Sequence, residues 1–230
     1  SMYNIQHTVT PNNGMLEVKL ECIRPDMEIH YTTDGSEPTA TSPLYEKIVP
    51  VKEALTLKGA IFAHGRQMGK TLILPVRWNL ATAKPVLGTN PTEKLLTNGI
   101  RGSLKYSDFE WCSWADNDSV SFTIDLLKLE MLNTLTLGCI TNNGMAIHKP
   151  ASVKVEVSDD NSNFREAAMQ SFTPEEIFRE GNFIENLPLK LGGTQGRYVR
   201  VSAKGPGVCP ASHVRSGQAS RIFFDEVMLE

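Results

Sequence analysis

Two tryptophans are the side chains of this sequence best suited to chemistry. Trp111 and Trp114 lie three residues apart in the polar stretch 107–114, which is typical of a loop. Aromatic rings pack against the apolar C–H faces of sugars, while polar groups hydrogen-bond to the hydroxyls. Both tryptophans are therefore candidates for a carbohydrate-binding surface. Burial in a core is the competing interpretation of each.

Four basic side chains are candidates to accompany them. They lie in turn-rich segments: His148, His213, Arg215 and Arg221. Imidazole and guanidinium groups donate hydrogen bonds that suit sugar hydroxyls. Simple surface solvation is the alternative for each, and His148, close before Pro150, also fits a hydrogen-bonded loop histidine.

Other chemistries find less support. None of the four cysteines, Cys22, Cys112, Cys139 and Cys209, forms a C-x-x-C pair, so zinc ribbons and thioredoxin-type sites are not indicated. A bridge between Cys112 and Cys209 stays open. No zinc-protease, serine-hydrolase, phosphate-loop or dinucleotide-binding motif occurs. Asn117 begins a formal glycosylation acceptor, which we discount. We expect no enzymatic activity in this chain.

Composition narrows the class of partner. The 230 residues include 23 Lys and Arg against 26 Asp and Glu, a net charge of −3, so no basic surplus exists for nucleic acid or an anionic membrane. No apolar run is long enough to span a membrane, and the N-terminal segment lacks the basic and apolar regions of a signal peptide. Ser1 ahead of Met2 resembles the remnant of a removed tag.

Period-two alternation dominates the chain and predicts an all-β protein. Apolar residues alternate with charged ones over 16–22, and further strands are expected at 28–33, 55–62 and 71–78. A second series begins near residue 120, after a proline-containing linker at 80–92. We therefore predict a small sandwich over 1–82 and a larger one over 83–230. Thr173, Pro174 and Glu176 predict one short helix with a capping box.

Two stretches resemble known families. Residues 29–39, IHYTTDGSEPT, followed by SPLY at 42–45, resemble the small C-terminal β-sandwich of chitobiases and β-hexosaminidases. This resemblance covers about residues 8–80. The same module also follows other exo-glycosidases, including α-L-fucosidases, and it implies an Ig-like spacer domain.

Residues 88–230 resemble a discoidin-like domain, the coagulation factor V/VIII type C family. The matching pieces, in order, are LTNG at 96–99, Trp111, IDL at 124–126, VSDD at 157–160, RYVRV at 197–201 and FDEV at 224–227. The resemblance implies a galactose-binding-like jelly-roll sandwich, and bacterial members often bind carbohydrate. Ser212 and Arg221 stand near positions where the family commonly has aromatic residues, which weakens the case for a stacking platform. Trp111 matches a position that is usually part of the core.

The resemblance also implies a structural calcium site. Its ligands would be the side chains of Asn98 and Glu226, Ser103, and nearby backbone carbonyls, which are the hard oxygen donors that calcium prefers. The family usually has Asp where this chain has Asn98, so one negative charge is missing. Asp225 and Glu226 also mimic a catalytic Asp–Glu pair, but they follow Ile-Phe-Phe in an expected last strand, where a structural role fits better.

The order of the two domains resembles that of the C-terminal half of bacterial family-20 β-N-acetylhexosaminidases. It implies a non-catalytic accessory region of a glycoside hydrolase, located in the periplasm, on the outer surface or outside the cell. The expected partners are a glycan with terminal galactose or N-acetylhexosamine and the catalytic domain of the parent enzyme. Two alternatives stay open: purely structural or dimerisation domains, and the same region of an α-L-fucosidase.

Overall fold

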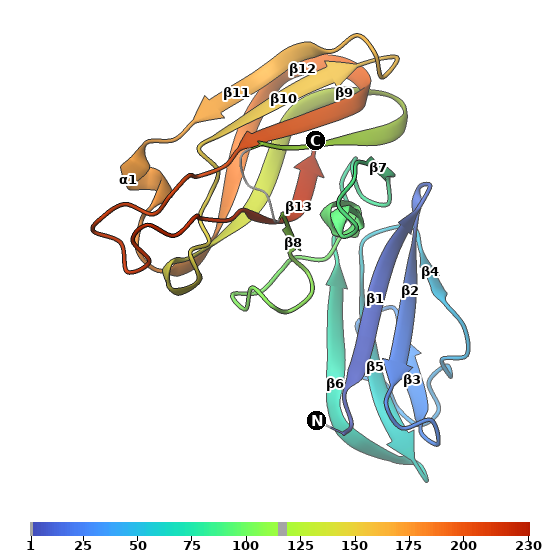
Figure 1. Ribbon diagram of the computed structural model, residues 1–230. Helices are drawn as coiled ribbons and strands as arrows, with labels where there is room; N and C mark the ends of the chain where they lie inside the picture. The colour runs from blue at the N-terminus through green and yellow to red at the C-terminus, as the bar shows by residue number, and fades with distance from the viewer. Residues whose placement is uncertain (1, 115–118) are drawn as a thin grey trace.

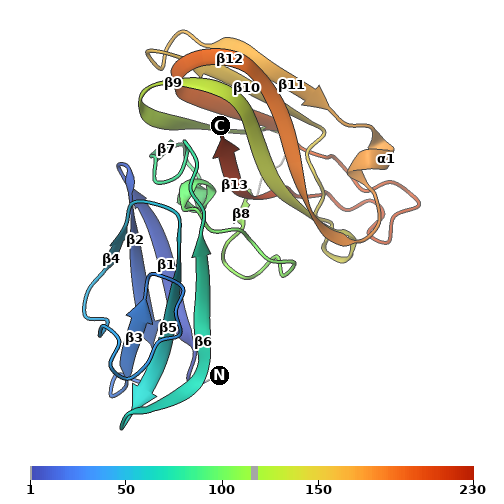
Figure 2. The same cartoon turned by 180° about the vertical axis from the view of Figure 1, so that it is seen from behind.

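A computed structural model describes residues 2–114 and 119–230 (Figures 1 and 2). The acceptor residue Asn117 and the initial Ser1 lie outside the described residues. Nearly all regular structure is β, which confirms the predicted fold class. The elements in chain order are β1 (Ile5–Asn12), β2 (Met15–Cys22), β3 (Glu28–Thr32), β4 (Val49–Val51), β5 (Leu55–Ala63), β6 (Arg66–Val76), β7 (Val86–Leu87), the 3-10 turn η1 (Glu93–Thr97), β8 (Cys112–Ser113), β9 (Ser119–Asn142), the 3-10 turn η2 (Asn143–Met145), β10 (Ser152–Ser158), β11 (Arg165–Ser171), α1 (Pro174–Ile177), β12 (Asn182–Lys204) and β13 (Phe223–Leu229).

The N-terminal part is a sandwich of two three-stranded antiparallel sheets. One sheet has the order β1-β2-β4 and the other β3-β5-β6. The alternation in β2 directs Leu16, Val18 and Leu20 inward, where each is buried. Pro50 lies in the edge strand β4, the place where a sheet tolerates a residue without a backbone N–H.

The C-terminal part is built around two long strands. β9 and β12 pair antiparallel along most of their lengths, and the sheet order is β11-β10-β12-β9-β13-β8, with β7 also pairing with β9. Residues 119–125 of β9 pair with residues 198–204 of β12, which also pair with β10. Residues 135–139 of β9 pair with β13. The two strands therefore pass from one layer of the larger sandwich to the other, as Figure 1 shows.

A polar contact stabilises the bend of β9. Asp125 accepts the backbone N–H of Leu127, which has a φ of 69°, and a bidentate ion pair from Arg197 on β12, with distances of 2.8 and 3.0 Å. The register of the two strands shifts at this place. Because the charged groups lie across the bend, they hold both strands at the transition between layers.

The short helix α1 confirms its sequence signal. Thr173 Oγ1 accepts the N–H of Glu176, and the Glu176 carboxylate accepts the N–H of Thr173, so the capping box is closed on both sides. The helix has only four residues.

The segment between the two sandwiches is packed against them and is not a solvent-exposed linker. Ala81 and Ala83 are fully buried, and Val86–Leu87 forms β7. Gly14 donates its N–H to Ala83 O at 2.9 Å, and His7 Nε2 lies 2.8 Å from Glu110 Oε1. These contacts join the two sandwiches directly.

Two local expectations differ from the structure. The last strand of the first sandwich begins at Arg66, not at Thr71, because His64 and Gly65 both take positive φ and close a tight hairpin. The four cysteines are free, so Cys112 and Cys209 form no bridge.

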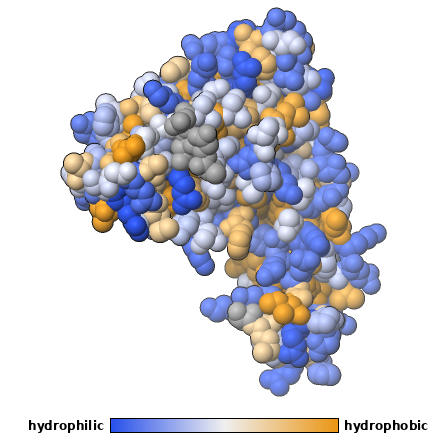
Figure 3. Space-filling model, in the orientation of Figure 1, coloured by the Kyte–Doolittle hydropathy of each residue, from blue (hydrophilic) through white to orange (hydrophobic). Residues whose placement is uncertain are grey.

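The surface is mixed in character. On the face in Figure 3, hydrophilic residues predominate and apolar residues occur in small separate groups. Among the described residues, no helix is both long enough and apolar enough to cross a membrane.

Candidate functional site

Three connections meet at one end of the larger sandwich. They are the segment around η2 after β9, the segment from α1 to β12, and the long connection 205–222 between β12 and β13. Figures 1 and 2 show them gathered at the end that carries α1. The strands behind them are paired by hydrogen bonds, and connections that project from such a scaffold commonly carry binding sites.

A cavity of about 590 Å³ opens between these connections. Its lining combines an aromatic ring, an amide, an imidazole and two carboxylates with smaller residues: Asn143, Pro174, Glu175, Phe178, Glu180, Gly181, Pro210, Ser212, His213 and Val214. This is the size range of small-molecule sites, and the mixture of one ring with convergent polar groups is typical of them.

Asn143 ties two walls of the cavity together. Its backbone N–H donates to Gly181 O at 3.2 Å, and its side-chain oxygen accepts the N–H of Gly181. Its Nδ2 lies 3.2 Å from Nε2 of His213. The amide therefore holds the segment after α1 and lies next to the predicted site residue His213.

His148 lies behind the cavity and not on its wall. It is fully buried, and its Nε2 is 2.9 Å from Nε2 of His213. The ring of Phe178 meets it edge-on, with centroids 5.1 Å apart. Burial, with repulsion from His213 as the second cause, lowers the pKa of His148 to about 4, so it is neutral at physiological pH.

The two predicted arginines are placed differently. Arg215 is exposed next to the cavity, and its Nε donates to Gly144 O at 2.8 Å, which links two of the connections. Arg221 is half-buried with its guanidinium 5.2 Å from the ring centre of Phe223, and it does not line the cavity.

The two predicted tryptophans also lie away from the cavity. Trp111 is only 5% exposed, packs with Ile140, Ile147 and Phe223, and donates its Nε1–H to Ser103 O at 3.0 Å. Its ring leaves no open face for a sugar, as its family position implied. Trp114 is half-buried and stacks on Phe122, with centroids 6.1 Å apart and planes inclined by 16°.

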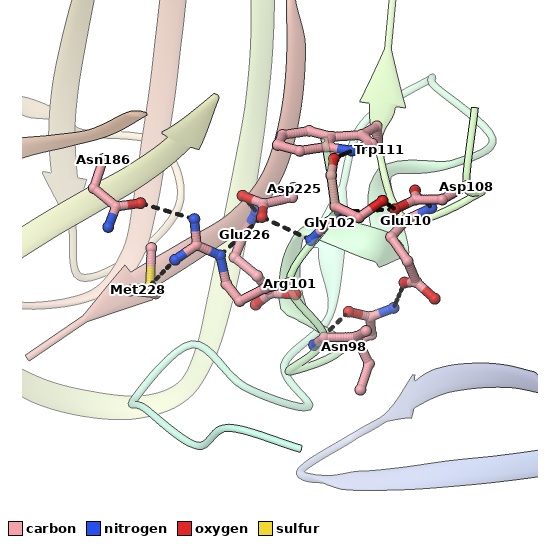
Figure 4. A network of polar contacts seen from close by, with 12 residues as sticks. Asn98, Arg101, Gly102, Asp108, Glu110, Trp111, Asn186, Asp225, Glu226 and Met228 are labelled. Atoms are coloured by element: carbon pink, nitrogen blue, oxygen red, sulfur yellow. Dashed lines mark hydrogen bonds and ion pairs between the residues drawn. The ribbon is translucent and has the colours of Figure 1, made fainter. Parts of the chain in front are cut away.

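A buried ion pair connects the last strand to the loop after η1 (Figure 4). Asp225 is fully buried and accepts Arg101 Nε at 2.8 Å and the N–H of Gly102 at 2.9 Å. Arg101 also donates to Asn186 Oδ1 at 2.7 Å. With its partners fixed in this way, Asp225 has a structural role.

Glu226 is the one buried carboxylate in this region without a partner among the described residues. It is 2% exposed, and neither of its oxygens has a hydrogen bond. Burial, followed by repulsion from Asp225, raises its pKa well above the usual value, and the nearby Arg101 and Ile100 N–H only partly oppose this. The Ile100 N–H donates instead to Asn98 Oδ1 at 3.0 Å.

The other two predicted calcium ligands have partners. Asn98 is 1% exposed, and its Nδ2 lies 3.4 Å from Glu110 Oε2. Ser103 is exposed, and its hydroxyl donates to Asp108 Oδ2 at 2.6 Å. Figure 4 shows Glu226 next to the loop that carries Asn98, whereas the Ser103 hydroxyl is occupied by Asp108.

Sequence reasoning missed Phe178 and Asn143. Phe178 directly follows the capping-box helix, so the signal that located α1 also marked an aromatic ring at its end. Asn143 lies in the Asn-Asn-Gly turn at 142–144, which reads from sequence only as a turn. Nothing local indicates that it faces His213, which lies 70 residues further along the chain.

Comparisons with known proteins match both halves of the chain. Residues 11–72 match the model of the chitobiase/beta-hexosaminidase C-terminal domain, and residues 81–216 match that of the F5/8 type C domain. No curated protein matches the chain.

Solved structures with a similar fold include three bacterial proteins. The Clostridium perfringens module CpGH89CBM32-6 is 16% identical, with a TM-score of 0.42, over 66% of this chain and 98% of that one. A fucose-binding module from Streptococcus pneumoniae is 19% identical, with a TM-score of 0.40, over 66% and 97%. The C-terminal domain of a Bacteroides fragilis chitobiase is 18% identical, with a TM-score of 0.35, over 57% and 76%.

Proposed function

The chain belongs to the F5/8 type C family, and from this premise we propose that it is a non-catalytic, carbohydrate-binding accessory region of a bacterial glycoside hydrolase. The chitobiase/beta-hexosaminidase C-terminal domain ahead of it supports a β-N-acetylhexosaminidase as the parent enzyme. Such an enzyme meets its polymeric substrate in the periplasm, on the outer surface or outside the cell, and this is the location we propose.

The observation that carries the binding proposal is the cavity with Phe178, Asn143 and His213 on its walls. The half-buried ring of Phe178 suits the C–H face of a sugar, while the amide and imidazole suit its hydroxyl or acetamido groups. The proposed ligand is a terminal galactose or N-acetylhexosamine. Trp111 is not part of this proposal because it is buried.

Weak binding is sufficient for this role. A module tethered to a catalytic domain raises the local concentration of the glycan near the active site without any new catalytic contact. No acid–base pair is required in the chain itself.

The test is a glycan array followed by titration of the best ligand, with Phe178→Ala and His213→Ala. We expect both variants to bind at least about tenfold more weakly, since each loses roughly 1.4 kcal/mol or more of contact. Phe109→Ala is the matched control, because Phe109 is 89% exposed but lies outside this cavity. A folded chain that binds no glycan, or equal binding by Phe178→Ala and wild type, contradicts the proposal.

We also propose that Glu226 and Asn98 hold a structural calcium ion. The support is the buried Glu226 carboxylate, whose two oxygens lack hydrogen bonds, next to the loop that carries the buried Asn98. Buried charges in proteins are paired or coordinate metals. Ser103 is dropped from the side-chain ligands, since its hydroxyl already hydrogen-bonds Asp108. Bound calcium would neutralise Glu226 and fix the loop after η1.

Docking on the catalytic domain is the second candidate role. The loop at 103–110 carries two exposed apolar side chains, Leu104 at 51% and Phe109 at 89%. These would suit an interface within the parent enzyme. If Phe109→Ala weakens association with a separately expressed catalytic domain while the array is blank, this role replaces glycan binding.

A further inference from the structure

Three metal-ligating side chains from distant parts of the sequence converge behind the cavity. His148, Cys209 and His213 each offer a ligand atom, and these atoms all lie within 4.8 Å of one another. His148 and Cys209 are buried, and His213 is partly exposed on the cavity wall. The sulfur is a free thiol. This cluster is separate from the loop of Asn98 and Glu226.

The backbone holds these three residues in place. Cys209 donates its N–H to Gln218 O at 2.9 Å and accepts the N–H of Gly217 at 3.0 Å, so the two sides of the 207–220 connection are paired around it. Val208 and Ala219 form a further bridge. The end of the connection 205–222 is bound to the segment that carries His148, because the His148 N–H donates to Arg221 O at 3.0 Å. The ligand atoms are therefore pre-organised by strand-like pairing.

The hydrogen bonding of the two imidazoles leaves one buried group unsatisfied. His213 Nδ1 accepts the N–H of Arg215 at 2.8 Å, so neutral His213 carries its proton on Nε2 and donates it to His148 Nε2. His148 then carries its own proton on Nδ1, a buried atom near the backbone of Ile177 but without a well-formed hydrogen bond. This is also the tautomer in which Nε2 of His148 is free to coordinate a metal.

The geometry points to a site for a single divalent transition-metal ion, with Zn²⁺ as the best match, held by His148, Cys209 and His213. Tetrahedral zinc with bonds of about 2.0–2.3 Å places two nitrogen ligands about 3.3 Å apart. The two Nε2 atoms are 2.9 Å apart, so the imidazoles need to separate by only a few tenths of an ångström, while the sulfur, within 4.8 Å of both, has to move closer to the ion. Nitrogen and thiolate ligands select zinc over calcium or magnesium.

Binding exchanges protons for metal bonds. The Cys209 thiol loses its proton to solvent as the zinc–sulfur bond forms. The proton of His213 moves from Nε2 to Nδ1, which breaks the bond from the Arg215 N–H on an exposed turn. A water molecule from the cavity, whose wall includes His213, would complete the four ligands of the ion.

The test uses the whole chain, reduced, freed of metal with a chelator and saturated with calcium, without glycan. Titration with Zn²⁺ is expected to show one equivalent bound, and Co²⁺ is expected to give the charge-transfer absorption of a thiolate ligand. Cys209→Ser is expected to lose that absorption and to bind Zn²⁺ at least about 100-fold more weakly. Cys22→Ser, a half-buried cysteine of the other sandwich, is the matched control and should bind as wild type does.

A second variant covers the case in which Cys209→Ser does not fold. His213→Gln removes a ligand at the partly exposed wall, and it should weaken zinc binding while its circular dichroism stays that of wild type. Absence of stoichiometric zinc binding, a cobalt complex without thiolate absorption, or unchanged affinity in a folded Cys209→Ser or His213→Gln overturns the site. Because no glycan is present, failure here leaves the sugar-binding proposal unaffected, and failure of the array leaves the zinc result unaffected.

Discussion

Replacing Glu226 by Gln tests the calcium proposal and the energetics of the last strand together. In the absence of calcium, the carboxyl group is buried with both oxygens unpartnered. An ionised group in that position costs roughly 3 kcal/mol. A chain of this length shifts its Tm by about 2–4 °C per kcal/mol, so the expected effect is roughly 6–12 °C.

The assay is thermal unfolding at pH 7.5, followed by the near-UV signal of the larger sandwich, with excess chelator or with excess calcium. We expect calcium to raise the Tm of wild type by roughly 6–12 °C and to leave Glu226→Gln unchanged. Without calcium the variant should unfold no lower than wild type, because it carries no buried charge.

The pH dependence supplies an independent check. Burial raises the pKa of Glu226 in the folded state above its value in the unfolded chain. Without calcium, the stabilisation from its bound proton is therefore complete below the unfolded pKa, and it is lost as the pH rises through the folded pKa. Glu226→Gln should lack this decline.

One combination of results would refute the reasoning. If calcium leaves the Tm of wild type unchanged and Glu226→Gln unfolds several degrees lower in chelator, the carboxylate is stabilised by a protein partner and not by a cation. Asp125→Asn is the control, since it breaks the Arg197 ion pair away from this loop and should lose stability equally with and without calcium.

Three further outcomes are expected. Gly138→Ala should lose about 3 kcal/mol or more in denaturant unfolding, because its Cβ would overlap the carboxylate of Asp225; unchanged stability would mean that this packing relaxes freely. Asp125→Asn should lower the free energy of unfolding by about 1 kcal/mol at neutral pH. Arg197 holds the pKa of Asp125 low, so wild type should lose this advantage as the pH falls through the folded pKa. If the stabilities of the two proteins run parallel from pH 7 to 3, the ion pair does not stabilise the fold. Thr173→Ala should lower stability by about 1 kcal/mol and weaken glycan binding, because α1 forms part of the cavity wall; unchanged glycan titration would show that the cap does not position that wall.

The all-β fold could be predicted because its signals are local. In β2 every second residue is apolar, and burial of Leu16, Val18 and Leu20 follows from the two-residue period of a strand. The capping box of α1 was equally local, since Thr173 and Glu176 bond to each other's backbone. The start of β6 was missed because residues 66–70 contain a single apolar side chain, Met68, and therefore carry no period-two pattern.

The candidate cavity could be predicted only in part. His213 was identified as a donor, and it lies on the wall. Its neighbours Asn143 and Phe178 were not identified, because their proximity depends on how β9, β12 and the connections between strands end at one side of the sandwich. The tryptophans were chosen for their chemistry, but Trp111 is buried since its indole packs over Gly102 and fills the space beside that backbone.

By itself, the sequence determined the strand pattern, the short helix and the resemblance to two families, because each depends on residues close together along the chain. Only the tertiary structure decided which donors meet. The approach of His148 to His213 spans 65 residues and that of Arg101 to Asp225 spans 124. Such contacts arise from long-range strand pairing, in which one register brings together side chains whose own sequence neighbourhoods carry no information about each other.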